Sequence, residues 1–229
     1  MRPKAILFDL DGTLVDSIRI FPQLIAQEFL DKPKSTQIRK YLIHVGKYYN
    51  ANNRFTWFRF ELLRAIRVDF NISWIRFFSG MIRVLWQFYK WDQKIHPFPE
   101  VPQTLRLLKN QGLKLGIVSN GSPYLLKKRF NPYLSLFDIL VDSKSLGVRK
   151  PSPIPIIYAC KKLNIPISKV IFIGDTLVDL LAAKNAGIQI ILVKTGVFGL
   201  PPFALVNYPP QAIIPAVGKE LISLIIKRD

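Results

Sequence analysis

Short apolar runs that end at acidic or small polar residues, with helical patterns between them, most constrain how this sequence can fold. Each run is followed at once by a side chain that can bind a ligand. The runs are residues 5–8 before Asp9, 113–118 before Ser119 and 170–173 before Gly174 and Asp175. Such alternation of strand and helix predicts an α/β fold with a doubly wound parallel sheet, in which ligands bind outside the carboxyl ends of the strands.

The remaining elements of this sheet domain follow from periodicity and from glycine placement. Gly112 and Gly187 stand where helices commonly end before the next strand. A loop is expected between Pro201-Pro202 and Pro209-Pro210. Helices are expected at 101–111, 124–130, 154–163, 177–186 and about 216–227, and a further strand at 189–193.

Residues 17–96 interrupt the alternation with long helical patterns, and they contain all four tryptophans. Pro97 and Pro99 provide a natural return to the sheet, since proline stops helices and stiffens linkers. We therefore expect an α/β core formed by residues 1–16 and 97–229, with an inserted α-helical cap domain at 17–96.

Composition limits the class of protein. With 229 residues, 49% hydrophobic and 21% charged, the chain has ordinary globular composition. The single cysteine, Cys160, permits no intrachain disulfide, which favours a cytoplasmic location, and its apolar neighbours give it no expected catalytic role. The longest apolar region, 72–91, is interrupted by basic residues, so we expect no membrane insertion. The net charge of +18 favours an anionic partner without choosing among nucleic acid, acidic lipid and a phosphorylated metabolite.

Asp9 and Asp11 lie two residues apart directly after the first predicted strand. Alternation along an extended chain sends both carboxylates toward the same side, and Gly12 allows the backbone to turn. Asp9 is then a candidate nucleophile and Asp11 a candidate general acid and base. A plain turn or a calcium-type loop would explain the same residues, so further context is needed.

That context comes from the segment Gly174 to Asp179, where another predicted strand ends in acids. Mg²⁺ usually binds a few carboxylates together with water and phosphate oxygens. Asp9, Asp175 and the backbone carbonyl of Asp11 are candidate ligands. We expect Asp179 to support the residues that bind the metal without binding the metal itself. Helix capping would also explain an acid at this position.

Two further segments are candidates for binding phosphate. Ser119 offers a hydroxyl group and Asn120 a backbone N–H at a strand end before a predicted helix. Lys150, in the segment 147–151, would neutralise charge on a transferring phosphoryl group and hold Asp9 in place. Ordinary turn chemistry and a solvated lysine are the alternatives for these residues.

Four segments of the chain together resemble the four motifs of the haloacid dehalogenase superfamily. They are Asp-x-Asp-Gly-Thr at 9–13, Ser-Asn-Gly at 119–121, Lys-Pro at 150–151 and Gly-Asp-x-x-x-Asp at 174–179. The resemblance spans residues 4 to about 193. It implies Asp9 as nucleophile and magnesium ligand, Asp11 as acid and base, Ser119 and Lys150 at the phosphate and Asp175 on the metal. Thr13 and Asp179 would support these groups. The helical insert after Asp16-Ser17 resembles the branch of phosphoglycolate-phosphatase-like enzymes.

The resemblance predicts a Mg²⁺-dependent phosphatase that hydrolyses a small, anionic phosphomonoester. Lys47 is a candidate for substrate specificity, because Gly46-Lys47 resembles a turn that approaches the substrate in related caps. A 2-haloacid dehalogenase would usually lack the second acid, so Asp11 argues against it. A sugar-phosphate mutase would keep both acids. A non-catalytic protein that binds nucleic acid or acidic membranes is a further alternative, against which the intact motifs count. The sequence leaves the substrate and the oligomeric state open.

Overall fold

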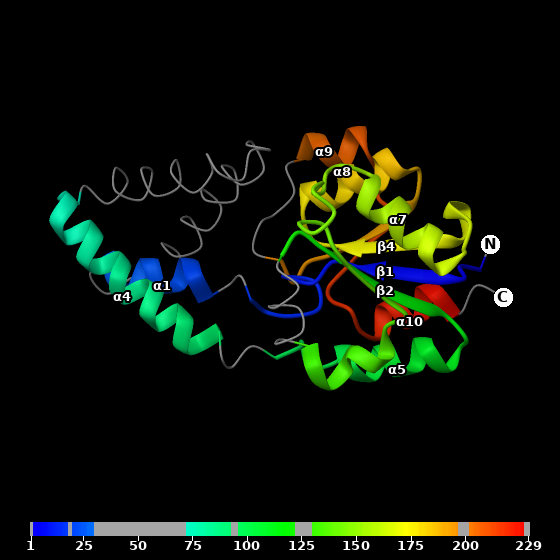
Figure 1. Ribbon diagram of the computed structural model, residues 1–229, viewed down its shortest axis with the longest axis horizontal. Coiled ribbons are helices and arrows are strands. Elements are labelled where there is room, and N and C mark those ends of the chain that lie inside the picture. Colours follow the sequence, from blue (N-terminus) through cyan, green and yellow to red (C-terminus); the bar gives the residue numbers. More distant parts are fainter. Residues whose placement is uncertain are drawn as a thin grey trace. The chain divides into compact units, whose positions relative to one another are not determined.

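The computed structural model describes residues 2–17, 20–29, 72–92, 96–121, 130–196 and 202–226. The chain divides into two compact units, one made of residues 1–16, 96–196 and 200–229 and the other of residues 17–95 and 197–199. The first unit contains the sheet and the second contains two of the described helices (Figure 1). The assignment of the second unit as a cap domain stays a prediction.

The described part of the first unit is built on a six-stranded sheet with the order β3-β2-β1-β4-β5-β6, in which every pair of neighbours is parallel. The predicted α/β fold with a parallel, doubly wound sheet is therefore confirmed. The strands are β1 (Ala5–Phe8), β2 (Lys114–Ser119), β3 (Ile139–Asp142), β4 (Val170–Gly174), β5 (Gln189–Val193) and β6 (Ala212–Ile214).

Helices cover both faces of the sheet (Figure 1). Helices α7 and α8 contact strands β2 to β5 from one side, while α5 and α10 contact each other and lie on the other side. The helices of this unit are α5 (Val101–Asn110), α7 (Ile154–Leu163), α8 (Leu177–Ala186), α9 (Pro202–Asn207) and α10 (Lys219–Ile226), with short 3₁₀ turns at Asn131–Leu136 and Ile167–Lys169.

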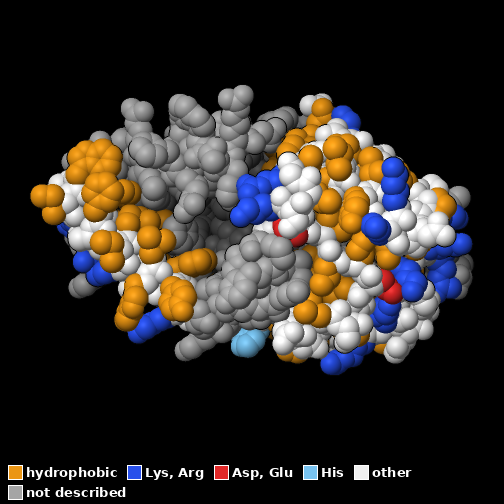
Figure 2. All heavy atoms as spheres, in the orientation of Figure 1, with side chains coloured by type: hydrophobic (Ala, Val, Ile, Leu, Met, Phe, Trp, Pro, Cys, Tyr) orange, Lys and Arg blue, Asp and Glu red, His pale blue; other side chains and the backbone are white. Residues whose placement is uncertain are grey.

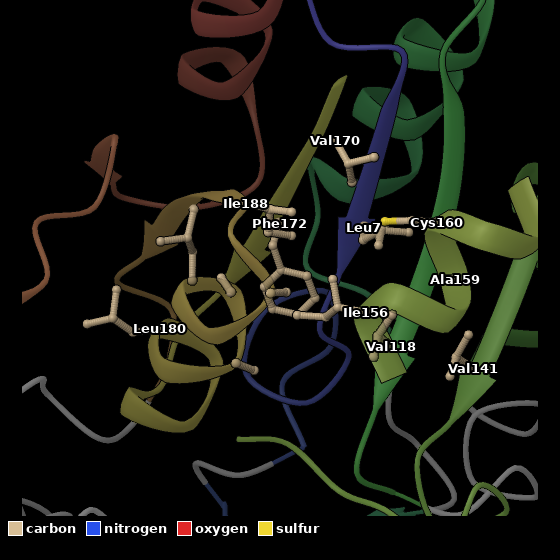
Figure 3. Packing of buried hydrophobic residues seen from close by; sticks show 14 of the residues in the cluster. Leu7, Val118, Val141, Ile156, Ala159, Cys160, Val170, Phe172, Leu180 and Ile188 are labelled. Carbon is tan, nitrogen blue, oxygen red and sulfur yellow. The ribbon is translucent and has the colours of Figure 1, made fainter. Parts of the chain in front are cut away.

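A continuous apolar core lies between the sheet and helices α7 and α8. This core includes Leu7 and Phe172 of the sheet, Ile156 of α7 and Leu180 of α8, which Figure 3 labels. The alternate side chains of β1, Ile6 and Phe8, are also fully buried and face the other side of the sheet. Burial of both faces explains why β1 reads as an unbroken apolar run.

Local sequence explains how the helices begin and end. Thr176 caps α8 by accepting a hydrogen bond from the N–H of Asp179, whose side chain in turn accepts from the N–H of Thr176. Gly187 ends α8 in the left-handed conformation with a φ of 71°, and Gly112, with a φ of 77°, follows α5. Both glycines thus lie where the sequence predicted helix ends.

Most of the predicted elements agree with the structure within three residues, but the region near the carboxyl terminus does not. The expected loop between the two proline pairs is wrong, because α9 begins there at Pro202. Proline is compatible with the first turn of a helix, where its missing N–H is not needed. Strands β3 and β6 were not predicted, since both are short edge strands with little pattern of their own. The helix predicted at 124–130 lies outside the described residues except at Phe130.

In the second unit, helix α1 (Ile20–Phe29) packs against α4 (Trp74–Asp92). The rings of Phe29 and Phe77 stack with their centroids 5.9 Å apart, and Val84 is fully buried. At the edge of this contact Arg83 forms an ion pair with Glu28. Within the described ranges, each helix is too short or too polar to cross a membrane.

Candidate active site

The register of the sheet brings the polar ends of three strands together. Phe8, the last residue of β1, pairs with Ile117 of β2 on one side and Ile173 of β4 on the other. Asp9 therefore emerges from the centre of the sheet between the ends of two neighbouring strands. Its N–H donates to the carbonyl oxygen of Ile173 at 2.8 Å, which fixes the backbone of the aspartate.

A buried lysine lies between two buried carboxylates at this edge. The ammonium group of Lys150 donates to Oδ1 of Asp9 at 2.5 Å and to Oδ1 of Asp179 at 2.7 Å. The side chain of the lysine is only 2% exposed. Charge-assisted bonds in such a setting hold all three groups in a fixed arrangement.

Asp179 is held from its other oxygen by the start of α8. Its Oδ2 accepts hydrogen bonds from Thr176 Oγ1 at 2.6 Å, from the N–H of Thr176 at 3.0 Å and from the N–H of Asp175 at 3.3 Å. The capping box thus also aims a carboxylate at Lys150. The helix cap that the sequence allowed for Asp179 is thus present, and its supporting role at the site stays a prediction.

Asp175 has one satisfied and one unsatisfied oxygen. Thr13 Oγ1 donates to Oδ1 of Asp175 at 2.9 Å, while Oδ2 is buried and has no hydrogen-bond partner among the described residues. Two glycines surround this oxygen: a Cβ atom at Gly12 would lie 2.5 Å from Oδ2, and one at Gly196 would also collide with it. A buried, unpaired carboxylate oxygen is costly unless a cation or a proton satisfies it.

These carboxylates form the group best suited to a metal ion among the described residues. Asp9, Asp175 and Asp179 each offer an oxygen within 4.8 Å of the others. Both oxygens of Asp179 already accept hydrogen bonds. Asp9 and Asp175 each accept through Oδ1, so their second oxygens are the better ligands for a cation. Oxygen donors of this kind suit a hard divalent cation such as Mg²⁺.

Burial and neighbouring charges shift the pKa values of the charged groups in this site. Burial raises the pKa of Asp9 to about 7, although the ammonium of Lys150 opposes the shift. Burial also raises the pKa of Asp175 well above its ordinary value, with the charges of Asp179 and Asp9 adding to the effect. For Lys150 burial alone would lower the pKa, but the carboxylates of Asp179 and Asp9 raise it above the ordinary range. The site therefore combines a permanent ammonium with carboxylates that a cation would help to ionise.

The turn after β2 is connected to Lys150 through Asn120. The side-chain amide of Asn120 donates to the carbonyl of Lys150 at 3.0 Å and accepts from the N–H of Lys150 at 2.9 Å. The Oγ of Ser119 accepts from the N–H of Gly121 at 2.9 Å. A Cβ atom at Gly121 would lie 3.1 Å from that Oγ and 3.6 Å from Oδ2 of Asp11, so Asp11 and Ser119 flank the same glycine.

The sequence comparison decides the family. The profile of the haloacid dehalogenase-like hydrolases matches residues 3–187. This chain belongs to that family. The predicted family resemblance is thus confirmed, and the chain is an enzyme of the hydrolase class.

Relatives of this hydrolase include phosphatases. A phosphoglycolate phosphatase of Aquifex aeolicus is 32% identical over 199 residues, covering 84% of this chain and 85% of the relative. A relative from Caldanaerobacter subterraneus that is named for pyrophosphatase activity (PpaX) is 27% identical over 215 residues, covering 90% and 87% of the two chains.

Solved structures support the fold of the hydrolase. A family hydrolase from Deinococcus radiodurans, with bound phosphate and sodium, is similar with a TM-score of 0.78 at 20% identity, covering 99% of this chain and 96% of that one. A haloacid dehalogenase-like protein from Agrobacterium tumefaciens has a TM-score of 0.72 at 18% identity and covers 99% of both chains.

The structure places the predicted residues of the hydrolase as follows. One hydrogen-bonded group contains Asp9, Thr13, Lys150, Asp175 and Asp179. Asp11, Ser119 and Asn120 lie around the adjacent turn, and the side chain of Asn120 bonds to the backbone of Lys150. The expected contact of the Asn120 N–H with phosphate stays a prediction. Lys47 and residues 124–129 of the helix expected at 124–130 lie outside the described residues. Cys160 is buried in the apolar core, where burial raises the pKa of its thiol to about 11.

Sequence reasoning missed three residues that shape this edge. Thr195, two residues after the end of β5, donates through Oγ1 to the carbonyl of Gly12 at 2.7 Å and so connects the turn after Asp9 to another strand end. Gly196 leaves room for the carboxylate of Asp175, and Thr176 bonds to Asp179. The position of Thr195 and Gly196 after an apolar strand was the only local signal that could have indicated them.

Proposed function

We propose that this enzyme is a Mg²⁺-dependent phosphatase that hydrolyses a small phosphomonoester through an aspartyl-phosphate on Asp9. The observation that carries the proposal is the position of Asp9: buried at the end of the central strand, 2.5 Å from Lys150 and grouped with Asp175 and Asp179. A nucleophile, an ammonium group and a cation site in one place are what phosphoryl transfer requires.

Asp9, Asp175 and the backbone carbonyl of Asp11 would hold the Mg²⁺. The fit rests on the unpaired, buried Oδ2 of Asp175 and on the pKa of Asp9, which burial raises to about 7 and which a cation would lower. When bound, Mg²⁺ supplies positive charge that offsets the negative charge of the phosphate and of the carboxylates.

In the first step, an oxygen of Asp9 forms a bond to phosphorus while the bond from phosphorus to the leaving oxygen breaks. Asp11 gives its proton to that oxygen, so that the product leaves as an alcohol. In the second step Asp11, now ionised, takes a proton from water, whose oxygen bonds to phosphorus as the bond to Asp9 breaks. Inorganic phosphate leaves and Asp11 is protonated again.

Lys150 and the turn after β2 would bind the phosphoryl group during both steps. The ammonium of Lys150 lies beside the attacking carboxylate, where it offsets charge that develops on the phosphoryl oxygens. The hydroxyl group of Ser119 and the N–H of Asn120 would donate to the same oxygens. Thr13 and Asp179 act through other residues, Thr13 by orienting Asp175 and Asp179 by orienting Lys150.

The substrate would be a small phosphorylated metabolite, and residues 17–96 would form the cap domain. The relative from Aquifex aeolicus makes phosphoglycolate the first compound to test, and the relative named PpaX makes pyrophosphate the second. Lys47 stays a candidate for contact with the substrate. A cytoplasmic location would suit such a substrate and the single cysteine.

A phosphate-release assay on a panel of phosphorylated metabolites, with Mg²⁺ and with a chelator, tests the proposal. We expect turnover of at least one compound, loss of turnover with the chelator and loss in Asp9→Asn. To find the intermediate, the acid-quenched enzyme is reduced with borohydride and the modified aspartate is located by mass spectrometry. A labelled residue other than Asp9, or full activity of Asp9→Asn, would refute the mechanism.

Gly12→Ala tests the metal site without removing a ligand. The new Cβ would lie 2.5 Å from Oδ2 of Asp175, so the oxygen must move away from the cation. Gly112→Ala is the matched control, because Gly112 also has a positive φ, 77°, but has no atom within 4 Å of the added group. We expect a roughly tenfold or larger rise in the Mg²⁺ concentration for half activity in Gly12→Ala only, since a misplaced ligand loses more than ~1 kcal/mol. Equal Mg²⁺ dependence in the two variants would argue against Asp175 as a ligand.

A further inference from the structure

Helix α4 of the second unit is apolar on two different faces. Phe77, Met81 and Val84 are buried on the face that packs against α1. A second set of large apolar side chains is 51% to 86% exposed. Its members are Trp74, Ile75, Phe78, Ile82, Leu85, Trp86 and Tyr89. Figure 2 shows hydrophobic side chains gathered over this helix.

The exposed set forms one continuous stripe. At about 100° per residue, its seven members fall within an arc of about 120° along the helix. Their exposed area is on the order of 1,000 Å², given that each aromatic side chain presents about 150–250 Å². The largest apolar patch on a typical monomer is about 300–600 Å², so a patch of this size marks a contact surface.

Basic residues border the stripe along one edge. Arg76, Arg83 and Lys90 follow at intervals of seven residues, so they form a line along the helix beside the apolar arc. The ammonium of Lys90 lies 3.5 Å from the centre of the Trp86 ring, and Arg83 pairs with Glu28. From Trp74 to Trp91 the helix contains no acidic residue, and the whole chain has a net charge of +18.

We propose that the exposed stripe of α4 binds the surface of an anionic lipid membrane. An apolar face with tryptophan, phenylalanine and leucine beside a line of basic residues is typical of helices that lie in the membrane interface, where tryptophan and tyrosine are favoured. Such a helix lies at the headgroup boundary and does not span the bilayer, which agrees with the polarity of α4. The basic line complements acidic headgroups.

Charge favours a lipid surface over a second copy of the chain. Pairing two copies through this stripe would bring two lines of basic residues together with no acidic residue of α4 between Trp74 and Trp91 to oppose them. Two chains that each carry +18 also repel each other. An acidic membrane can bury the exposed apolar side chains and also pair with the basic residues beside them.

Co-sedimentation of the full chain with vesicles tests the proposal. The vesicles contain phosphatidylcholine alone or phosphatidylcholine mixed with phosphatidylglycerol. We expect the protein to bind the mixed vesicles, to bind phosphatidylcholine alone far more weakly, and to lose part of its affinity as salt rises. Fluorescence of Trp74 and Trp86 should shift to the blue on binding. Absence of binding to the mixed vesicles would overturn the proposal.

Variants of the stripe separate apolar insertion from charge alone. Ile75→Ser and Ile82→Ser should each weaken binding to mixed vesicles about tenfold, because each removes an apolar side chain from the interface. Arg76→Gln should weaken it about fivefold. Val206→Ser is the matched control, since Val206 is 80% exposed on α9 in the other unit, and it should bind as the wild type does.

If the two isoleucine variants bind mixed vesicles as strongly as the wild type does, the proposal is overturned. The positive charge of the chain would then be enough to explain the binding. A wild-type dimer that dissociates in Ile82→Ser without any vesicle binding would overturn it in favour of a contact between copies. Since these side chains are exposed, thermal unfolding and phosphate release of the variants should match the wild type, which checks that folding is intact.

Discussion

Asp179→Asn removes one of the two negative charges that contact Lys150 while keeping the size of the side chain. In the wild type Oδ1 of Asp179 accepts from Lys150, and Oδ2 accepts three hydrogen bonds from Asp175 and Thr176. An asparagine has only one acceptor oxygen. Its NH₂ group must face either the ammonium of Lys150 or the N–H and O–H donors at the start of α8.

The expected loss of stability in Asp179→Asn follows from the burial of the two side chains. Asp179 is 1% exposed and Lys150 is 5% exposed, so water cannot replace the lost contacts. Breaking a buried ion pair costs about 3–5 kcal/mol, and Lys150 keeps Asp9 as a partner. We therefore expect the free energy of unfolding to fall by about 3 kcal/mol.

Urea denaturation followed by circular dichroism, with a chelator present, measures this loss. Asp138→Asn is the matched control, because Asp138 also pairs with lysines, Lys109 and Lys114, but at a more exposed position. That variant should lose about 1 kcal/mol or less. If Asp179→Asn were as stable as Asp138→Asn, Lys150 would not depend on two carboxylates and the reasoning would be refuted.

Two further predictions concern pH and the loop that holds Lys150. Burial raises the pKa of Asp9 from 3.8 to about 7, so the folded state keeps a proton that the unfolded state loses. With respect to this group, the metal-free protein should be most stable below pH 3.8 and should lose that stability as the pH rises to about 7. Added Mg²⁺ should raise the melting temperature more above pH 7 than near ~pH 5. A melting temperature whose response to Mg²⁺ does not change with pH would contradict this. Asn120→Ala removes both side-chain bonds to the backbone of Lys150, which are partly buried, and should lower kcat about tenfold, since their loss costs about 1–3 kcal/mol. Asn185→Ala removes a single exposed bond to the neighbouring Pro151 and should leave kcat near the wild-type value in the same phosphate-release assay.

The sequence predicted the parts of the fold that depend on neighbours along the chain. Strand β1 and helices α7 and α8 have their predicted bounds, because apolar periodicity and local caps such as Thr176 and Gly187 act within a few residues. Short edge strands such as β6 form only when a partner strand is already in place, so three residues of sequence carried too little pattern to predict it.

The candidate site shows the same division. Acids at strand ends indicated Asp9, Asp11 and Asp175 from sequence alone, since parallel strands end at one edge of a sheet. The side-chain bonds of Asn120 to the backbone of Lys150, and the bond from Thr195 to Gly12, join residues 30 and 183 positions apart, and no local pattern specifies them.

By itself the sequence determined the α/β alternation, the order of the acidic motifs and the excess of positive charge. Only the tertiary structure decided that Lys150 lies between Asp9 and Asp179, that one oxygen of Asp175 is buried without a partner, and that one apolar stripe of α4 stays exposed. The physical reason is that propensity and capping act over one or two helical turns, whereas burial and ion pairing depend on which distant segments the folded sheet brings into contact.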